Sequence, residues 1–447
     1  MQKIENNLTQ GNLFTKLVLF ALPFLASNLI QSFYNVADML IVGNFAGMVS
    51  MSGVNIGGQV TFILTNVVVG FTMGATVLIG QYLGSGNRVA LERVTATIIT
   101  LLLVLSVVVT ALMLAFKRPL LNSIKTPAEA FAESDVYLTV TVIGIVFIFG
   151  YNALAAILRG MGNSRQPFYF VLVACITNIV LDLLFVAVFQ WKAFGAALAT
   201  VISQALSTVF CIVYMVKNRF HFDFRVSSFR IYVDQLAKIT RIGLPTCVQN
   251  AVTSLSFLFL TAIVNTFGVG ASAAVGAVGK FNSFAFMPVM AISASISSVA
   301  AQNIGAGKMD RAIAACRVGT AFAVVLMWVF FLGVQLFPGQ ILALFGRDTE
   351  MIQNGITYLR SFSFDFLIVP FVFCINGFLI GGGHTFFTLI TSMLSAMVLR
   401  IPVCWIFGIA LDKGLFGVGL GAPIASAGAL LLIIGYMISG KWKKNAV

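Results

Sequence analysis

Apolar residues occur in long runs along the chain, and short segments with charged residues, glycine or proline separate one run from the next. A helix that crosses a bilayer needs roughly 20 apolar residues. Twelve runs reach this length, so the pattern predicts an all-α polytopic membrane protein with twelve transmembrane helices. The predicted spans lie near residues 14–41, 53–82, 94–116, 136–158, 167–189, 194–216, 240–267, 273–303, 315–337, 355–379, 385–409 and 416–438.

Composition and charge agree with a membrane protein. The 447 residues are 59% hydrophobic and 9% charged, with a mean hydropathy of +1.01, whereas soluble domains are about 25% charged. The net charge of +13 comes from basic residues in segments such as "GSGNRVALER" and "KWKK", which lie between or after the apolar runs. This is the charge bias that orients membrane proteins. We therefore expect no nucleic-acid partner, and both termini on the cytoplasmic side of a bacterial or archaeal cytoplasmic membrane.

The chain contains an internal repeat. Four short segments of the first half match segments of the second half at a nearly constant offset in the numbering, 221 or 222: "GQYLGSGN" from Gly80 with "AQNIGAGK" from Ala301, "ILRGMGN" from Ile157 with "FLIGGGH" from Phe378, "ALPF" from Ala21 with "GLPT" from Gly243, and "FGAALA" from Phe194 with "FGVGLG" from Phe416. The offset covers six spans, an even number, so both halves have the same orientation in the membrane.

This repeat predicts the domain organisation. We expect a six-helix lobe at residues 1–220, a cytoplasmic linker at 221–238 and a second six-helix lobe at 239–447. The two lobes should be related by a pseudo-two-fold axis along the membrane normal, with a cavity between them.

The two lobes, the "YNVADMLIVG" stretch of the first span, the doubled "GQYLGSGN" turn and "LRGMGNSRQP" after the fourth span together resemble the multidrug and toxic compound extrusion (MATE) transporters. The resemblance covers nearly the whole chain. It implies an antiporter, acting as a monomer, that expels small organic compounds, often cationic and aromatic, by alternating access. It also implies that a cation gradient drives export, with no bound cofactor.

Three acidic residues lie inside predicted spans, namely Asp38, Asp182 and Asp365. A carboxylate at the centre of a bilayer costs about 2.5 to 3.5 kcal/mol and usually binds an ion or relays protons. Asn178 and Asp182 are four residues apart, on one helical face, and Thr200 lies at a similar predicted depth. With Asp38, these oxygens would form a site for Na⁺ or a proton. The alternative is that the carboxylates only fix the packing of the helices.

The resemblance gives the same four residues a role. In the archaeal and DNA-damage-inducible-like branches of the MATE family, the N-terminal lobe holds the coupling cation, and Asp38, Asn178, Asp182 and Thr200 match that pattern. The family's other arrangement uses acids in spans 7 and 10, but here span 7 has none.

The second lobe has its own polar cluster within apolar runs, formed by Lys280, Asp365 and Arg400. Because buried charges need partners, we expect Asp365 to form a structural ion pair with Lys280 or Arg400. A role in binding substrate or the coupling ion is the alternative.

Further polar residues are expected to line the substrate cavity, although each could equally serve to hold helices together. They are Gln31, Tyr34, Asn35, Asn152, Gln249 and Asn282.

No ATP-binding loop is present. The two Gly-Lys pairs lack the first glycine of G-x-x-x-x-G-K-[ST] and are followed by Phe281 and Met309. The sequence thus predicts secondary active transport by H⁺ or Na⁺ antiport, or both. Two alternative functions predict different sequence features. A flippase for a lipid-linked precursor would be expected to carry more cations along its groove, and an intramembrane enzyme would need a catalytic motif that the sequence lacks.

Overall fold

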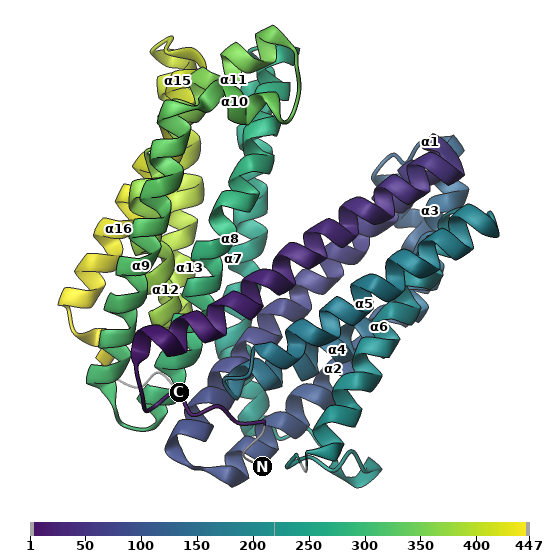
Figure 1. The fold of residues 1–447 in the computed structure, drawn as a ribbon, viewed down its shortest axis with the longest axis vertical. Coiled ribbons are helices and arrows are strands. Elements are labelled where there is room, and N and C mark those ends of the chain that lie inside the picture. Colours follow the sequence, from purple (N-terminus) through teal and green to yellow (C-terminus); the bar gives the residue numbers. More distant parts are fainter. Residues whose placement is uncertain (1–3, 219, 444–447) are drawn as a thin grey trace. The chain divides into compact units, whose positions relative to one another are not determined.

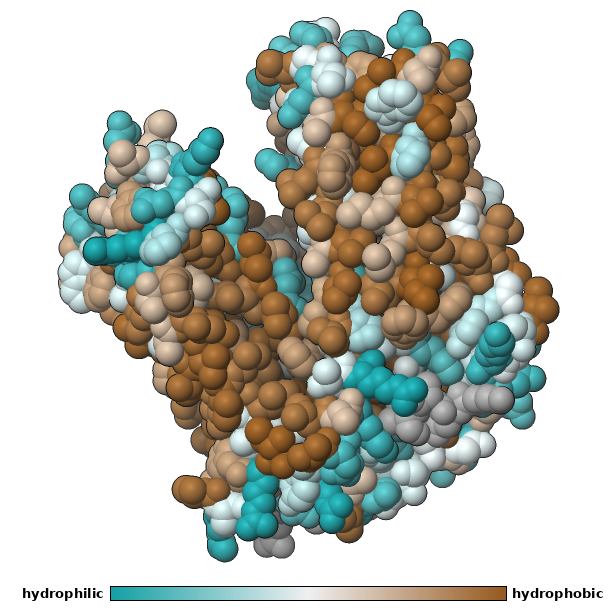
Figure 2. Space-filling view, turned by 180° about the vertical axis from the view of Figure 1, so that it is seen from behind, coloured by the Kyte–Doolittle hydropathy of each residue, from teal (hydrophilic) through white to brown (hydrophobic). Residues whose placement is uncertain are grey.

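The computed structural model describes residues 4–218 and 220–443, and helices dominate it (Figure 1). In this part of the chain, nine helices are long and apolar enough to cross a membrane, or eleven if each of two bent helix pairs forms one span. The expected all-helical polytopic architecture is therefore confirmed. Figure 2 shows apolar side chains over the middle of the helices and polar side chains gathered at their ends, as a bilayer requires.

The chain forms two compact units. The first unit comprises Met1–Leu8 and Leu22–Gly243, and the second comprises Thr9–Ala21 and Leu244–Val447. The segment 221–238, which we expected to be a linker between lobes, lies within the limits of the first unit.

The first unit contains most of α1 (Leu13–Ser85), whose 73 residues are enough for two spans. At Gly47 the backbone leaves the helical conformation, with φ 83° and ψ 175°. The break separates the predicted spans 14–41 and 53–82. The elements that follow are α2 (Arg88–Ser123), α3 (Ala128–Ile143), α4 (Ile145–Gly160), α5 (Arg165–Asp182), the π-helical η1 (Leu183–Val188), α6 (Lys192–Lys217) and the short 3₁₀ helix η2 (Val226–Ser228).

The second unit begins within α7 (Val233–Asn265). Its further elements are α8 (Val269–Gly305), α9 (Met309–Leu336), α10 (Pro338–Ala343), α11 (Thr349–Phe362), α12 (Asp365–Gly381), α13 (Thr385–Met393), the π-helical η3 (Leu394–Arg400), α14 (Ile401–Trp405), the π-helical η4 (Ile406–Ala410), α15 (Gly414–Gly419), α16 (Gly421–Ile438) and the 3₁₀ helix η5 (Lys441–Lys443). Two predicted spans are bent. The pair α3 and α4 bends by 49°, and the pair α11 and α12 by 51°.

The backbone repeats itself between the units. Five pairs of positions with positive φ are separated by the same offset as the sequence repeat: Gly47 and Gly268, Gly86 and Gly307, Gly162 and Gly383, Gln190 and Asp412, and Lys192 and Gly414. At Gly47 and Gly268, ψ is also close to 180°, a conformation essentially restricted to glycine. The turns at these positions thus have the same backbone geometry in both halves.

The start of the chain is bound to the first unit by polar contacts. Asn163 donates a hydrogen bond from Nδ2 to the carbonyl oxygen of Ile4 (3.2 Å). The carboxylate of Glu5 forms an ion pair with Arg88 and a hydrogen bond with His221 Nε2 (2.9 Å). Burial opposes ionisation of Glu5, but hydrogen bonds from Arg88 and His221 outweigh it and lower the pKa of this carboxyl group.

The next residues belong to the second unit. Lys308 Nζ donates to the carbonyl oxygen of Thr9 (3.2 Å), and Ser295 Oγ donates to that of Leu17 (2.9 Å). In the opposite direction, the first part of α7 packs against the first unit so closely that a Cβ atom on Gly74 would lie 2.5 Å from the carbonyl oxygen of Ile239. Each unit therefore contains a segment from the other half of the sequence.

Candidate cation site

Two buried carboxyl groups meet inside the first unit. Asp38 lies on the first stretch of α1 with a 7% exposed side chain, and Asp182, the last residue of α5, is fully buried. The two groups are within hydrogen-bonding distance of each other. Two carboxylates cannot share such a contact while both are ionised and alone, because like charges repel and neither has a donor. The contact therefore requires a proton or a cation.

Within the described residues, several oxygens of this cluster receive no hydrogen bond from a donor group. They are Asp38 Oδ1, both carboxyl oxygens of Asp182, and Asn178 Oδ1. The amide nitrogen of Asn178 points the other way, since it donates to Thr200 Oγ1 at 3.5 Å. Carboxylate, amide and hydroxyl oxygens are hard ligands, which suit Na⁺ as well as a proton. The structure thus brings together the four residues Asp38, Asn178, Asp182 and Thr200 that the sequence singled out.

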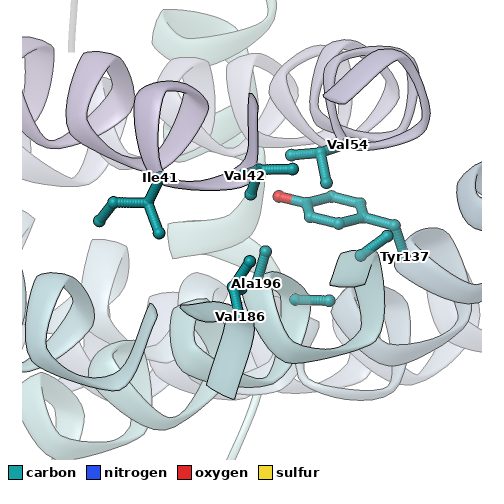
Figure 3. Close-up of a cluster of buried hydrophobic side chains, with 8 residues drawn as sticks. Ile41, Val42, Val54, Tyr137, Val186 and Ala196 are labelled. Carbon is teal, nitrogen blue, oxygen red and sulfur yellow. The ribbon is translucent and has the colours of Figure 1, made fainter. Parts of the chain in front are cut away.

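A change in helix type follows Asp182. The α-helix α5 ends there and the π-helical turn η1 begins at Leu183. Such π-helical turns are rare and occur frequently at functional sites. Apolar side chains of α1, α3, η1 and α6 form a cluster around Tyr137 (Figure 3). Figure 3 shows the Tyr137 hydroxyl directed toward Val42, which lies one turn after Asp38 on α1.

A cavity of about 530 Å³ adjoins the carboxyl groups. Its wall comes from α1, α3, α4, α5 and α6 of the first unit. Asp38 is part of this wall, whereas Asp182 is fully buried and does not line the cavity. Seven of the residues singled out from the sequence line the cavity: Gln31, Tyr34, Asn35, Asp38, Asn152, Asn178 and Thr200. The remaining two cavity candidates lie in the second unit. Gln249 donates to Ser392 Oγ (2.8 Å), and Asn282 is buried.

The MatE family model matches the chain twice, at residues 23–184 and 245–406. The chain belongs to the MatE family. The starts of the two matches are separated by the offset of the internal repeat. A MatE protein is a membrane transporter, so the expectation that the chain is not an enzyme is confirmed.

Similar proteins align with nearly the full length of this MatE chain. A probable multidrug resistance protein of Bacillus subtilis, YoeA, is 29% identical over 436 residues, which cover 96% of this chain and 94% of YoeA. A probable multidrug resistance protein of Thermotoga maritima, NorM, is 28% identical over 444 residues, covering 97% and 94%. A crystal structure of MATE in the bent conformation has a TM-score of 0.90 at 23% identity, with 98% and 96% of the chains covered. The MATE fold is therefore shared.

Two tyrosines complete the candidate site of this MatE protein. Tyr34 and Tyr137 line the same cavity as Thr200. Tyr34 was expected in the cavity, but Tyr137 was not among the predicted residues, since it stands at the outer edge of a predicted span. The internal repeat contains a signal for Tyr137, because a second tyrosine, Tyr358, occupies the equivalent position of the second half.

The predicted ion pair of the second unit is wrong. Neither Lys280 nor Arg400 lies within 4.0 Å of the Asp365 carboxylate, although both cations and the acid are among the described residues. Asp365 is the first residue of α12, where free backbone N–H groups favour a negative charge, and Ser426 is within hydrogen-bonding distance. Arg400 instead lies over the ring of Phe257, 5.3 Å from its centroid. The side chain of Lys280 is exposed.

Proposed function

We propose that this MatE protein is a secondary active multidrug exporter, in which antiport of H⁺ or Na⁺, or of both, drives alternating access. The adjacent carboxyl groups of Asp38 and Asp182, with unpartnered oxygens beside a polar cavity, carry this proposal. The substrates are small organic compounds, often cationic and aromatic. The description of YoeA and NorM as probable multidrug resistance proteins supports this substrate class.

The coupling of cation binding to the conformational change follows from the energetics of Asp38 and Asp182, here called the acid pair. Burial of two uncompensated carboxylates is costly, and binding of a proton or Na⁺ between them removes most of that cost. A conformation that buries the pair more deeply is therefore favoured when the cation is bound. Linkage then requires that the cation and an organic substrate change each other's affinity by the same factor. Asn178 and Thr200 supply neutral oxygens that hold Na⁺ without adding further charge.

In the membrane, we propose twelve spans in two six-helix lobes related by a pseudo-two-fold axis along the membrane normal. The break of α1 at Gly47 and the five repeated positive-φ positions support this arrangement. Both termini are cytoplasmic, in agreement with the basic loops, and the protein acts as a monomer.

Dye efflux from everted membrane vesicles tests the acid pair. Asp38→Asn and Asp182→Asn should each fold, because an amide nearly matches a carboxyl group in shape, yet each should lose gradient-driven efflux. The double variant should be hardly worse than either single variant, because all three remove the same functional unit. Glu92→Gln, at an exposed position of α2, is the matched control and should keep full efflux. Wild-type efflux in both single variants would place coupling elsewhere.

The same vesicles distinguish coupling to H⁺ from coupling to Na⁺, and an antiporter from a flippase. An imposed proton gradient and an imposed Na⁺ gradient, applied separately, identify the coupling ion by the one that accelerates efflux. A flippase for a lipid-linked precursor would export no dye under either gradient.

A further inference from the structure

Two cations of the second unit lack an acidic partner. Lys280 lies about three turns inside α8, and the described residues offer it neither an ion pair nor a hydrogen bond. Arg400 has a buried Nε atom without a hydrogen-bond acceptor, and its guanidinium lies over the Phe257 ring. Asp365 acts on Arg400 electrostatically but does not contact it. Cations inside membrane helices face a polar partner or water as a rule.

The repeat relates the positions of these two cations to the cavity of the first unit. In the first unit, Gln59 and Asn178 line one cavity. Their counterparts in the repeat are Lys280 and Arg400. The two cations therefore occupy positions of the second unit that are equivalent to two positions of this cavity wall.

Phenylalanine replaces a polar residue at three further positions of that wall. Cavity-lining Thr65, Thr141 and Asn152 are replaced at the equivalent positions of the repeat by three phenylalanines, Phe286, Phe362 and Phe373. These rings pack together, with centroids of Phe286 and Phe362 6.3 Å apart and those of Phe286 and Phe373 also 6.3 Å apart. At five positions that line the polar cavity of the first unit, the second unit thus has two cations and three aromatic residues.

We propose that Lys280 and Arg400 form a site for the anionic group, a carboxylate or sulfonate, of an aromatic ligand. A guanidinium binds a carboxylate through two parallel hydrogen bonds, and an ammonium adds a second positive charge. The exposed Phe257 ring beside Arg400 provides an apolar surface for the aromatic part of the ligand. The proposal rests on the proposed export of organic compounds and extends it to substrates that carry a negative group.

A matched pair of dyes tests this site. Rhodamine 110 has a free carboxylate, and rhodamine 123 is its methyl ester, so the two differ only in that group. Fluorescence anisotropy with the full chain in lipid nanodiscs measures the affinity of both. Lys280→Gln and Arg400→Gln should each weaken binding of rhodamine 110 by about tenfold, and should change binding of rhodamine 123 by less than about twofold.

Two further variants make the test specific. Lys280→Arg keeps the charge and should keep rhodamine 110 binding, and Arg347→Gln removes an exposed cation of a loop in the same unit and should change neither affinity. Equal loss of both dyes in the glutamine variants would overturn the site, as would an absence of rhodamine 110 binding to the unaltered protein. If rhodamine 123 is still exported in that case, the proposed function stands and only the anionic site fails.

Discussion

The two units share a backbone and differ in chemistry at equivalent positions. Four polar residues of the first unit, Asp38, Asn178, Asp182 and Thr200, correspond to Leu260, Arg400, Cys404 and Ala422 of the second. The π-helical turn that follows Asp182 has its counterpart in η4, which begins shortly after Cys404. The repeat thus preserves several backbone turns, while the two carboxyl groups of the candidate cation site occur only in the first unit. If the proposed site binds a cation, the side chains and not the shared turns account for it.

The largest effect is expected when the chemistry of the second unit is transferred to the first. Asn178→Arg places a permanent cation beside Asp38 and Asp182, where the adjoining cavity has room for a longer side chain. The guanidinium should neutralise the acids in every state, so gradient-driven efflux should fall to the level of Asp38→Asn. The melting temperature should stay the same or rise, since a buried charge gains a partner.

Dye efflux and thermal unfolding of the purified variant measure both outcomes. The reverse transfer, Arg400→Asn, is the control and should keep gradient-driven efflux of a cationic dye. Normal efflux in Asn178→Arg would mean that this amide is not part of the cation site.

The second prediction concerns what the units share. Gly47→Ala and Gly268→Ala force a side chain into the same strained conformation, and each should lower the free energy of unfolding by about 1–3 kcal/mol. A new Cβ atom meets nothing within 4 Å at either position, so backbone strain is the sole cause. Gly333→Ala, in α9 with equally open space, should instead be neutral or stabilising. Chemical denaturation of the three variants checks this, and very unequal losses at the two strained glycines would contradict a shared backbone.

A smaller effect is expected at Asp365, for which the corresponding residue of the first unit is Gly144. Since no ion pair forms, Asp365→Asn removes mainly a favourable interaction at the start of α12 and should cost about 1 kcal/mol or less. Loss of one partner of a buried ion pair would cost about 3–5 kcal/mol. Efflux and its dependence on the gradient should stay unchanged. A stable variant that no longer couples would bring Asp365 into the functional site.

The smallest effect concerns the contacts of the first and last described segments of the chain. Each segment is bound by a residue at an equivalent position of the repeat. Asn163 binds the Ile4 carbonyl, and His384, its counterpart in the repeat, contacts the carbonyl of Trp442 at 2.9 Å. The ion pair of Glu5 with Arg88 reinforces the first of these contacts, so Glu5→Gln should lower the melting temperature by about 1–2 °C at neutral pH.

The pH dependence of this difference has a definite sign. The folded state lowers the pKa of Glu5, so its contribution is present above the unfolded value of about 4.3 and fades as the pH falls through the lower folded value. Melting curves of the wild type and the variant should converge at acidic pH. A constant difference across the pH range would show that the carboxylate charge does not stabilise the contact.

Some of these features could be read from the sequence. Run length gives the spans, because a bilayer imposes a minimum apolar length. The four-residue spacing of Asn178 and Asp182 gives a common helix face, and their predicted depth puts them near Asp38 and Thr200. The bends of the α3 and α4 pair and the α11 and α12 pair could not be predicted, because the apolar runs continue through them.

The wrong prediction of an ion pair for Asp365 shows a second limit of sequence-based prediction. Position along a span fixes the depth of a side chain, but not the direction in which it points from its helix toward other helices. Lys280, Asp365 and Arg400 share apolar surroundings in the sequence, yet they point to different neighbours. The π-helical turns η1, η3 and η4 were missed for a related reason, since no residue type marks them.

The exchange of segments between the units has a consequence for the synthesis of the protein. Thr9–Ala21 leaves the ribosome early, but its partners Ser295 and Lys308 belong to the second half of the sequence. At about 5–20 residues per second, the segment waits roughly 15–60 s for them. During that interval its contacts with the second unit cannot form. The first unit, for its part, is complete only when translation reaches Gly243. A ribosome that stops between the halves therefore leaves both units unfinished.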